Sequence, residues 1–254
     1  MRRIAVINQK GGVGKTTTAI NLGAYLSRAG KSVLVVDLDP QANATSSLGA
    51  DKNAVQASTY DALLSGDIPA ASVLFNERLQ IALLPSSPAL AGAEIELVDE
   101  LGREFRLKNA LRSVDGKYDY ILIDCPPSLG ILTVNGLVAS RDGVLVPVQC
   151  EYLALEGLGQ ISQTIERVRS VLFPELRVRG VVLTMFDPRT NLSSDVVREV
   201  NNHFPGQVFK SVIPRSIRLA EAPSYGLPIS AYAPASVGAK AYESLAKELV
   251  LGDK

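Results

Sequence analysis

Residues 4–18 of the chain read IAVINQKGGVGKTTT, and this stretch decides the fold. Residues 4–7 form a short, β-branched apolar run of the kind that makes a buried parallel strand. A glycine-rich loop and a Lys-Thr pair follow, and then a helical pattern places Ile20 and Ala24 on one face. Strand, glycine-rich loop and helix in this order are typical of a phosphate-binding loop.

The loop residues match the needs of a nucleoside triphosphate and its metal. Glycines let backbone N–H groups close around phosphate oxygens, and the following helix directs the positive end of its dipole at the same oxygens. Lys15 supplies charge for the β- and γ-phosphates, and the Thr16 hydroxyl is placed for Mg²⁺. The predicted nucleotide-binding residues of the loop are Gly11, Gly12, Val13, Gly14, Lys15, Thr16 and Thr17.

The loop departs from the usual G-x-x-x-x-G-K-[ST] pattern near its start. Gln9 stands where the first glycine is expected, and Lys10 precedes the glycines. Because Lys15 already serves the phosphates of its own subunit, Lys10 is either a solvated surface lysine or a lysine with a separate function. Within the sequence KGGVGKTT we favour the functional interpretation.

Two further apolar runs, at residues 33–36 and 120–123, end in aspartates. Ligands of an open α/β sheet lie outside the carboxyl ends of its strands, so we expect Asp37, Asp39 and Asp124 beside the loop. Carboxylates there meet Mg²⁺ or an attacking water. For Asp37 and Asp39 the alternative is that the aspartate caps the start of the next helix. We favour this alternative for neither residue. The predicted metal ligands are Thr16, Asp39 and Asp124.

Strand and helix patterns alternate along the whole chain. We therefore predict one α/β domain over residues 1–254, with a doubly wound, mostly parallel sheet flanked by helices. Further strands are expected at residues 79–84, 144–148 and 178–185. Helices are expected from Ser58 or Thr59 to Leu64, at 89–101, 105–114 and 153–172, from Ser193 or Ser194 to about Asn202, and from Ser236 to about Leu249; a polar loop is expected at 219–228.

Composition narrows the function. Lysine plus arginine and aspartate plus glutamate both number 26, so the molecule as a whole does not attract DNA or acidic lipid, and any such binding needs a local patch. Two cysteines, Cys125 and Cys150, make neither a disulfide framework nor, with the one histidine, a zinc site. No apolar run reaches the length of a signal peptide or a membrane span, and we expect a cytoplasmic protein.

The motifs KGGVGKTT, VDLDPQ and YILIDCPPS, with Ile213-Pro214-Arg215, resemble the ParA/MinD family of deviant Walker A ATPases, and most of all its chromosomal, Soj-like branch. The resemblance implies that Lys10 reaches the partner's nucleotide across a dimer, that Asp39 acts on the water, and that Met185 and Pro214 lie near adenine. It also implies an ATP-bound sandwich dimer on non-specific DNA at the nucleoid, and a ParB-type centromere-binding partner. The predicted catalytic residues are then Lys10, Lys15, Asp39 and Asp124.

The DNA surface is the least defined feature of the sequence. Between Arg189 and Arg218 five basic residues face two acidic ones, an excess that surface helices often show. The resemblance favours Arg189, Arg215 and Arg218 as DNA contacts. Two rival classes are a MinD-like membrane-cycling ATPase and an iron–sulfur electron carrier. The last helical segment mixes both charge signs and does not resemble a membrane anchor, and the cysteines lack the flanking glycines of a cluster site.

Overall fold

The computed structural model describes residues 1–151 and 154–253. Its centre is a seven-stranded sheet in the order β3-β4-β2-β5-β1-β6-β7, in which only the β3–β4 pair is antiparallel. The strands are β1 (Arg2–Val6), β2 (Val33–Asp37), β3 (Leu74–Asn76), β4 (Ile81–Leu84), β5 (Tyr120–Asp124), β6 (Val144–Gln149) and β7 (Val178–Thr184).

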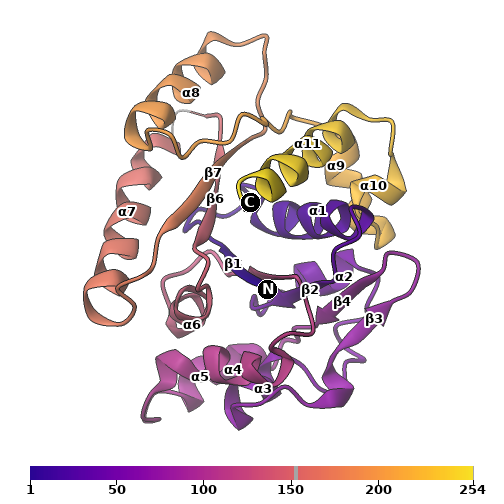
Figure 1. The fold of residues 1–254 in the computed structure, drawn as a ribbon, viewed down its shortest axis with the longest axis vertical. Coiled ribbons are helices and arrows are strands. Elements are labelled where there is room, and N and C mark those ends of the chain that lie inside the picture. Colours follow the sequence, from indigo (N-terminus) through magenta and orange to yellow (C-terminus); the bar gives the residue numbers. More distant parts are fainter. Residues whose placement is uncertain (152–153, 254) are drawn as a thin grey trace.

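Helices cover both faces of the sheet (Figure 1). One face carries α1 (Lys15–Arg28), α2 (Asn43–Ser47), α9 (Ile217–Glu221), α10 (Ile229–Tyr232) and α11 (Val237–Leu251). The other face carries α3 (Thr59–Ser65), α4 (Leu90–Glu96), α5 (Arg106–Ala110), α6 (Ile131–Ala139), α7 (Ala154–Val171) and α8 (Asn191–His203). No helix among the described residues is both long and apolar enough to cross a membrane.

Strand β1 shows why its sequence is apolar without interruption. Ile4 and Val6 pack into the core under α1 and α11, whereas Ala5 and Ile7 pack into the core on the opposite face. Successive side chains of a strand point to opposite faces, so a strand with helices on both sides must be apolar at every position. The predicted doubly wound, mostly parallel sheet is confirmed.

Capping residues set several helix ends where the sequence predicts them. Ser58 begins α3 with a capping box closed by Asp61, and Gly66 ends that helix in the left-handed region at φ 74°. Ser236 begins α11, where its side chain accepts the Ala239 N–H. The start of α8 is different: Thr190, not a serine, is its N-cap, accepting the Ser193 N–H.

Other predicted boundaries are wrong. The strand expected from residue 79 begins at Ile81, after Gln80 turns the chain at φ 54°. The helix expected at 89–101 ends at Glu96, and the one at 105–114 is a short α5 followed by a 3-10 turn. The predicted loop at 219–228 contains short helices, and β3 and α6 were not expected at all. Helix α6 reads ILTVNGLVA, which is buried nearly all round and lacks an amphipathic pattern. Leu153 lies outside the described residues.

Strand β6 contains a proline, which predicts a strand end or an irregularity. Pro147 instead lies within β6, opposite Val182, and the irregular register is at Val144 and Leu145. The Leu145 carbonyl accepts the Ile7 N–H on the β1 side, and the Pro147 carbonyl accepts the Asn8 side-chain amide there. Pro147 lacks an N–H, but this position of β6 lies beyond the end of β1. The β1–β6 ladder therefore loses no backbone hydrogen bond at the proline.

Candidate nucleotide site

The phosphate-binding loop joins the carboxyl end of β1 to the first turn of α1. Gly12 and Gly14 have φ of 74° and 90°, a region that residues with a Cβ rarely adopt. A Cβ built on Gly11 or Gly12 would meet nothing within 4 Å, so the loop faces open space. Gly14 is the N-cap of α1 and supplies no side-chain cap. The helix start therefore presents N–H groups and a positive dipole to that space, as an anion site requires.

Lys15 is buried to an unusual degree for a lysine, with 7% of the residue exposed. Its Nζ donates to the Lys10 carbonyl at 3.0 Å. Burial lowers the pKa of Lys15, and the carboxylates of Asp124 and Asp39 oppose that shift. The lysine is thus held inside the loop, at a charge-rich site where a phosphate would replace a neutral carbonyl as its partner.

Asp124 ends β5 and lies opposite Asp37 of β2 and Val6 of β1 in the sheet register. Both of its carboxylate oxygens are buried, and neither has a hydrogen-bond partner among the described residues. Burial and the neighbouring Asp37 raise the pKa of Asp124 well above its ordinary value, and the Thr16 hydroxyl opposes this. Two orphaned acceptors beside a hydroxyl fit a divalent cation or its waters.

The described residues contain no cluster of three or more His, Cys, Asp or Glu side chains that would hold a metal alone. Mg²⁺ is commonly bound by one or two carboxylates together with waters and substrate phosphates. Asp124, with the nearby Thr16 and Asp39, fits that mode of binding. A nucleotide and its metal would complete this site together.

The two aspartates after β2 have different surroundings. Asp37 is fully buried; its Oδ2 accepts from both the N–H and the hydroxyl of Thr45 at 2.7 Å, and its Oδ1 accepts the Asp39 N–H at 3.2 Å. Burial nevertheless raises the pKa of Asp37 to about 6. Asp37 therefore holds α2 against the end of β2 without beginning it, since the N-cap of α2 is Ala42. The prediction that neither aspartate opens the next helix is confirmed. Asp39 uses one oxygen on the Gln41 N–H at 2.9 Å, so its other oxygen is left to the site.

A cavity of about 390 Å³ adjoins the loop on the β7 side. It brings Met185 and Pro214, predicted near the base, together with Gly14 and Thr17 of the loop. Met185 has a φ of 52°, unusual for a residue with a Cβ, and the adjacent Phe186 pairs with Pro214 in an isolated bridge. The cavity has the concave, mostly apolar form that a flat heterocycle fills.

Sequence reasoning missed two residues that hold this region together. Thr184, at the end of β7, donates its hydroxyl to the Val13 carbonyl at 2.8 Å. Tyr242 of α11 is buried against the same cavity, with its hydroxyl 3.2 Å from that of Thr18. Thr184 could have been predicted, because it is a hydroxyl residue at the carboxyl end of a strand. The sequence around Tyr242 contains no pattern that predicts its contact with the site.

The three arginines predicted to contact DNA are exposed, and each pairs with a carboxylate. Arg189 pairs with Asp187 at 2.6 Å, Arg218 with Glu221 at 2.9 Å, and Arg215 with Glu151. The Arg189 guanidinium holds the pKa of Asp187 near 2. Exposed ion pairs contribute only about 0–1 kcal/mol each. These ion pairs therefore hold the arginines only weakly, and an incoming anion would displace the carboxylates at little cost.

Known proteins match this chain over nearly its full length. A family model described as an AAA domain matches residues 1–178. The sporulation initiation inhibitor protein Soj of Bacillus subtilis is 54% identical over 250 residues, 97% of both chains. The chromosome partitioning protein ParA of Myxococcus xanthus is 50% identical over 253 residues, 99% of this chain and 89% of that one. The chain belongs to the Soj/ParA family. The predicted resemblance is confirmed.

A solved structure carries a different printed name. The Mycobacterium smegmatis protein described as cobyrinic acid a,c-diamide synthase, with bound ATP analogue and magnesium, has a TM-score of 0.86 and 42% identity, covering 98% of this chain and 94% of that one. Cys125 and Cys150 of the ParA-family chain are buried, and burial raises both thiol pKa values, that of Cys150 to about 12. Neither cysteine therefore has the lowered pKa of a reactive thiolate.

Proposed function

We propose that the chain is a Mg²⁺-dependent ATPase that partitions DNA, with residues 1–254 acting as one domain. The observation that carries the proposal is the buried, unpartnered carboxylate of Asp124 beside Lys15 and the open glycine loop. This arrangement fits a triphosphate with its metal better than any other ligand, because it combines an anion cradle with orphaned cation ligands.

Each residue of the site then has a distinct task. The N–H groups of the loop and Lys15 bind the phosphates, while Met185 and Pro214 contact the base. Thr16, Asp124 and Asp39 hold the Mg²⁺, which would neutralise the charge that develops on the phosphates. Asp39, with one carboxylate oxygen left to the site, also orients the attacking water.

Lys10 has a task that its own subunit does not require. Lys15 already occupies the loop and contacts the Lys10 backbone, not its side chain. We assign the Lys10 ammonium to the nucleotide of a second subunit in an ATP-bound homodimer. Lys10→Ala should then bind ATP as a monomer and fail to hydrolyse it.

The proposed track is non-specific double-stranded DNA, contacted by Arg189, Arg215 and Arg218 of both subunits. A dimer would double this small basic set, whose present partners are weak surface pairs. A ParB-type protein would stimulate hydrolysis and release the dimer, with the protein in the cytoplasm and on the nucleoid. A MinD-like role on membranes is the alternative, but α11 pairs Lys247 with Glu243 and has no uniformly basic face.

A gel shift on unrelated DNA tests the proposal, with ADP, ATP and a slowly hydrolysed analogue compared at several salt concentrations. Asp39→Ala should bind ATP and dimerise, and should hold DNA without turnover. Arg189→Glu with Arg218→Glu should weaken DNA binding and flatten its salt dependence by about one log-log unit per lost contact, while dimerisation persists. Arg169→Glu, on an exposed i,i+3 pair elsewhere, is the control. DNA binding that ignores both the nucleotide and the paired substitution would contradict the proposal.

A further inference from the structure

The tripeptide Asn8-Gln9-Lys10 that leads into the glycine loop is anchored at three points. The Asn8 side chain is buried; its Nδ2 donates to the Pro147 carbonyl of β6 at 2.7 Å and its Oδ1 accepts the Lys10 N–H at 3.0 Å. The Lys10 carbonyl accepts from Lys15. The third anchor is Gln9, the residue that replaces the usual first glycine.

Gln9 reaches out of the loop to α7. Its Nε2 donates to the Thr164 hydroxyl at 2.9 Å and lies 3.3 Å from the Gln160 carbonyl. The Thr164 hydroxyl in turn donates to that same carbonyl at 2.9 Å, and only 9% of Thr164 is exposed. Glycine at this position would leave the loop without a side-chain bond to α7. The departure from the usual motif therefore creates a specific connection between two elements that are 155 positions apart.

Lys15 cannot keep its present bond once a triphosphate binds. In the proposed site its ammonium turns to the phosphates, and the Lys10 carbonyl loses its donor. Two anchors then remain for the peptide that carries Lys10: Asn8, which holds its N–H, and Gln9, which holds the preceding residue to α7. The precision of Lys10 depends on these anchors, because a shift of about 1 Å can cost 100-fold in rate.

We propose that Gln9 is a positioning residue, which couples the nucleotide loop to α7 and holds the Lys10 peptide in place when Lys15 moves to the phosphates. The effect on turnover rests on the function proposed above for Lys10, whereas the coupling to α7 does not. Helix α7 packs on α8, where Ser162 lies 3.1 Å from His203, and α8 begins at Thr190, next to Arg189.

Hydrogen exchange measured by mass spectrometry tests the coupling without using turnover. In the parent, ADP or a slowly hydrolysed ATP analogue should slow amide exchange in peptides covering residues 8–18 and, in addition, residues 158–168 of α7. Gln9→Met keeps the length of the side chain and removes the amide donor, and Thr164→Val keeps the shape and removes the acceptor. Both variants should keep the protection of the loop and lose the added protection of α7. Thr164→Ser retains the hydroxyl and should behave as the parent.

Steady-state kinetics separate positioning from nucleotide binding. Gln9→Met and Thr164→Val should each lower kcat by about tenfold while the Kd for ATP changes by less than about twofold. The double variant should be no slower than either single one, because both changes remove the same bond.

Two results would overturn the inference. The first is exchange in α7 that does not respond to nucleotide in the parent. The second is α7 protection that survives in both Gln9→Met and Thr164→Val. Failure of the proposed function has a different signature: Lys10→Ala would turn over ATP at the parent rate, and the loss of α7 protection in Gln9→Met would still establish the coupling.

Discussion

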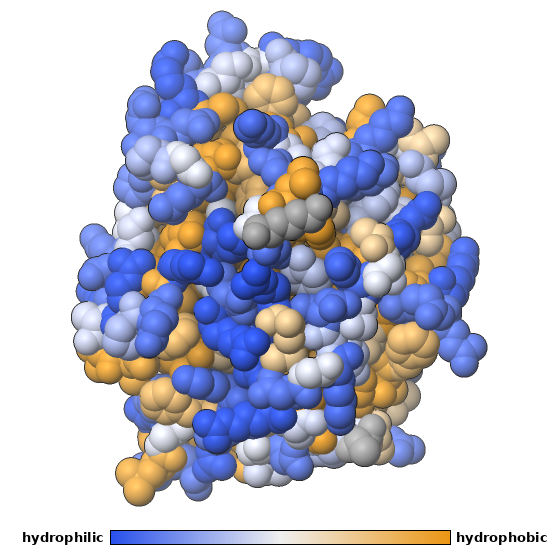
Figure 2. Space-filling view, viewed as in Figure 1, coloured by the Kyte–Doolittle hydropathy of each residue, from blue (hydrophilic) through white to orange (hydrophobic). Residues whose placement is uncertain are grey.

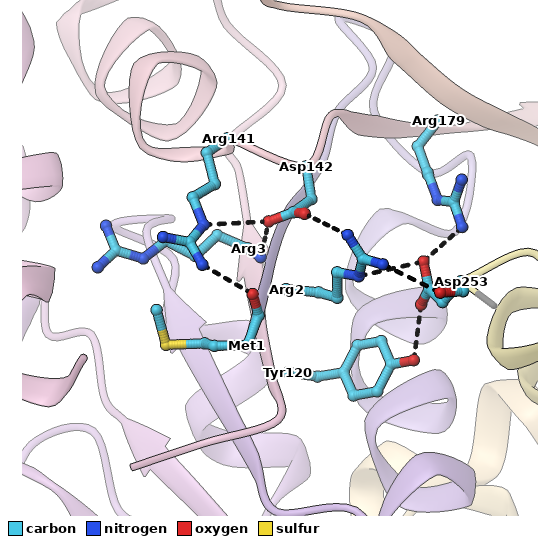
Figure 3. A network of polar contacts seen from close by, with 8 residues as sticks. All are labelled: Met1, Arg2, Arg3, Tyr120, Arg141, Asp142, Arg179 and Asp253. Atoms are coloured by element: carbon cyan, nitrogen blue, oxygen red, sulfur yellow. Dashed lines mark hydrogen bonds and ion pairs between the residues drawn. The ribbon is translucent and has the colours of Figure 1, made fainter. Parts of the chain in front are cut away.

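Charged side chains at the two ends of the parallel strands differ in whether they have partners. We call the amino ends of the strands the amino edge of the sheet, and their carboxyl ends the carboxyl edge. At the amino edge, Arg2 bonds to Asp142 at 3.0 Å, and Asp253 accepts from Arg179 at 2.5 Å and from the Tyr120 hydroxyl at 2.6 Å (Figure 3). At the carboxyl edge, both oxygens of Asp124 are buried without a partner among residues 1–151 and 154–253, and within those residues the Lys15 ammonium bonds only to a carbonyl of its own loop. The amino edge satisfies its charges internally, and the carboxyl edge does not.

The amino edge also joins elements that are distant in sequence. Arg2 of β1, Tyr120 of β5 and Arg179 of β7 all contact Asp253, the second residue after α11. Both chain ends lie in the middle of the face drawn in Figure 1, and hydrophilic residues gather there in Figure 2. This edge fixes α11 to the sheet, and α11 in turn places Tyr242 against the cavity that adjoins the glycine loop.

The difference shows how a fold divides its electrostatics between stability and binding. A buried charge that is fully bonded holds elements in register, whereas a buried charge without a partner raises the free energy of the folded state until a ligand supplies one. Substitutions at the carboxyl edge should therefore change ligand binding, and those at the amino edge should change the free energy of unfolding.

The largest expected effect is at the carboxyl edge. Lys15→Ala removes the buried lysine ammonium of the loop and should weaken ATP binding by at least about 100-fold, or about 3 kcal/mol, because a charge-assisted phosphate contact is lost. Calorimetric titration with ATP and Mg²⁺ measures this, with the exposed Lys247→Ala as the matched control. Near-normal affinity in Lys15→Ala would mean that the nucleotide binds elsewhere.

At the amino edge, Asp253→Ala should lower the free energy of unfolding by about 3 kcal/mol, because it leaves the Arg179 guanidinium and the Tyr120 hydroxyl without their acceptor, although Arg2 keeps its bond to Asp142. The Asp253 side chain is 11% exposed, so water does not replace the lost bonds freely. Urea unfolding measures the change, and Asp195→Ala, on an exposed pair with Arg198, should cost about 0.5 kcal/mol. ATP affinity should remain unchanged; if it fell in parallel with stability, the two edges would not be separable.

The carboxyl edge was predictable from sequence and the amino edge was not. Apolar runs that end in Asp37 and Asp124 carry a local pattern, and the topology of parallel strands brings their ends together beside the loop. The bond from Arg2 to Asp253 spans 251 positions, with no periodicity or motif to indicate it. The same holds for Gln9, which the sequence marked only as a departure from a pattern.

Short helices are the other features that the sequence did not predict. Short helices form within residues 217–232, although the prolines and glycine of residues 219–228 predict a loop. Packing of Leu219 and Ile229 into the core stabilises turns that would not form alone. Likewise, the role of Asp37 in holding α2 depends on a tertiary contact with Thr45, eight positions further along the chain. Tertiary contacts, not local propensity, decide such segments.

The buried carboxyl group of Asp124 predicts that the stability of the folded protein depends on pH. The raised pKa of Asp124 means that the unfolded chain loses this proton first, near the ordinary pKa of about 4, while the folded chain retains it. Stability therefore falls as pH rises through that window and into the range where the folded carboxyl ionises. Asp124→Asn should stabilise the nucleotide-free protein by about 2 kcal/mol at pH 8, and by less at pH 5.

Urea unfolding of the parent and Asp124→Asn at both pH values measures this gap, and Asp39→Asn controls for the loss of a less buried carboxylate. The same Asp124→Asn variant should lose the enhancement of ATP binding by Mg²⁺. A parent as stable as Asp124→Asn at pH 8 would show that the carboxylate is already satisfied, and that the contrast between the two edges does not hold at this residue.

The smallest expected effect ranks the contacts within the amino edge. Arg141 bonds to the Met1 carbonyl at 2.9 Å and lies 3.4 Å from Asp142, but its side chain is 52% exposed. When the Arg141 side chain is removed, water can bond to the Met1 carbonyl and to Asp142 in its place. Arg141→Ala should therefore lower the free energy of unfolding by only about 0.5 kcal/mol. Arg179→Ala, whose side chain is 20% exposed and bonded to Asp253, should cost several times as much, because Asp253 then loses a buried partner. Urea unfolding of the two variants beside Asp253→Ala gives the order. Equal losses for Arg141 and Arg179 would show that the network acts as one cooperative unit, in which burial does not set the contribution of each arginine.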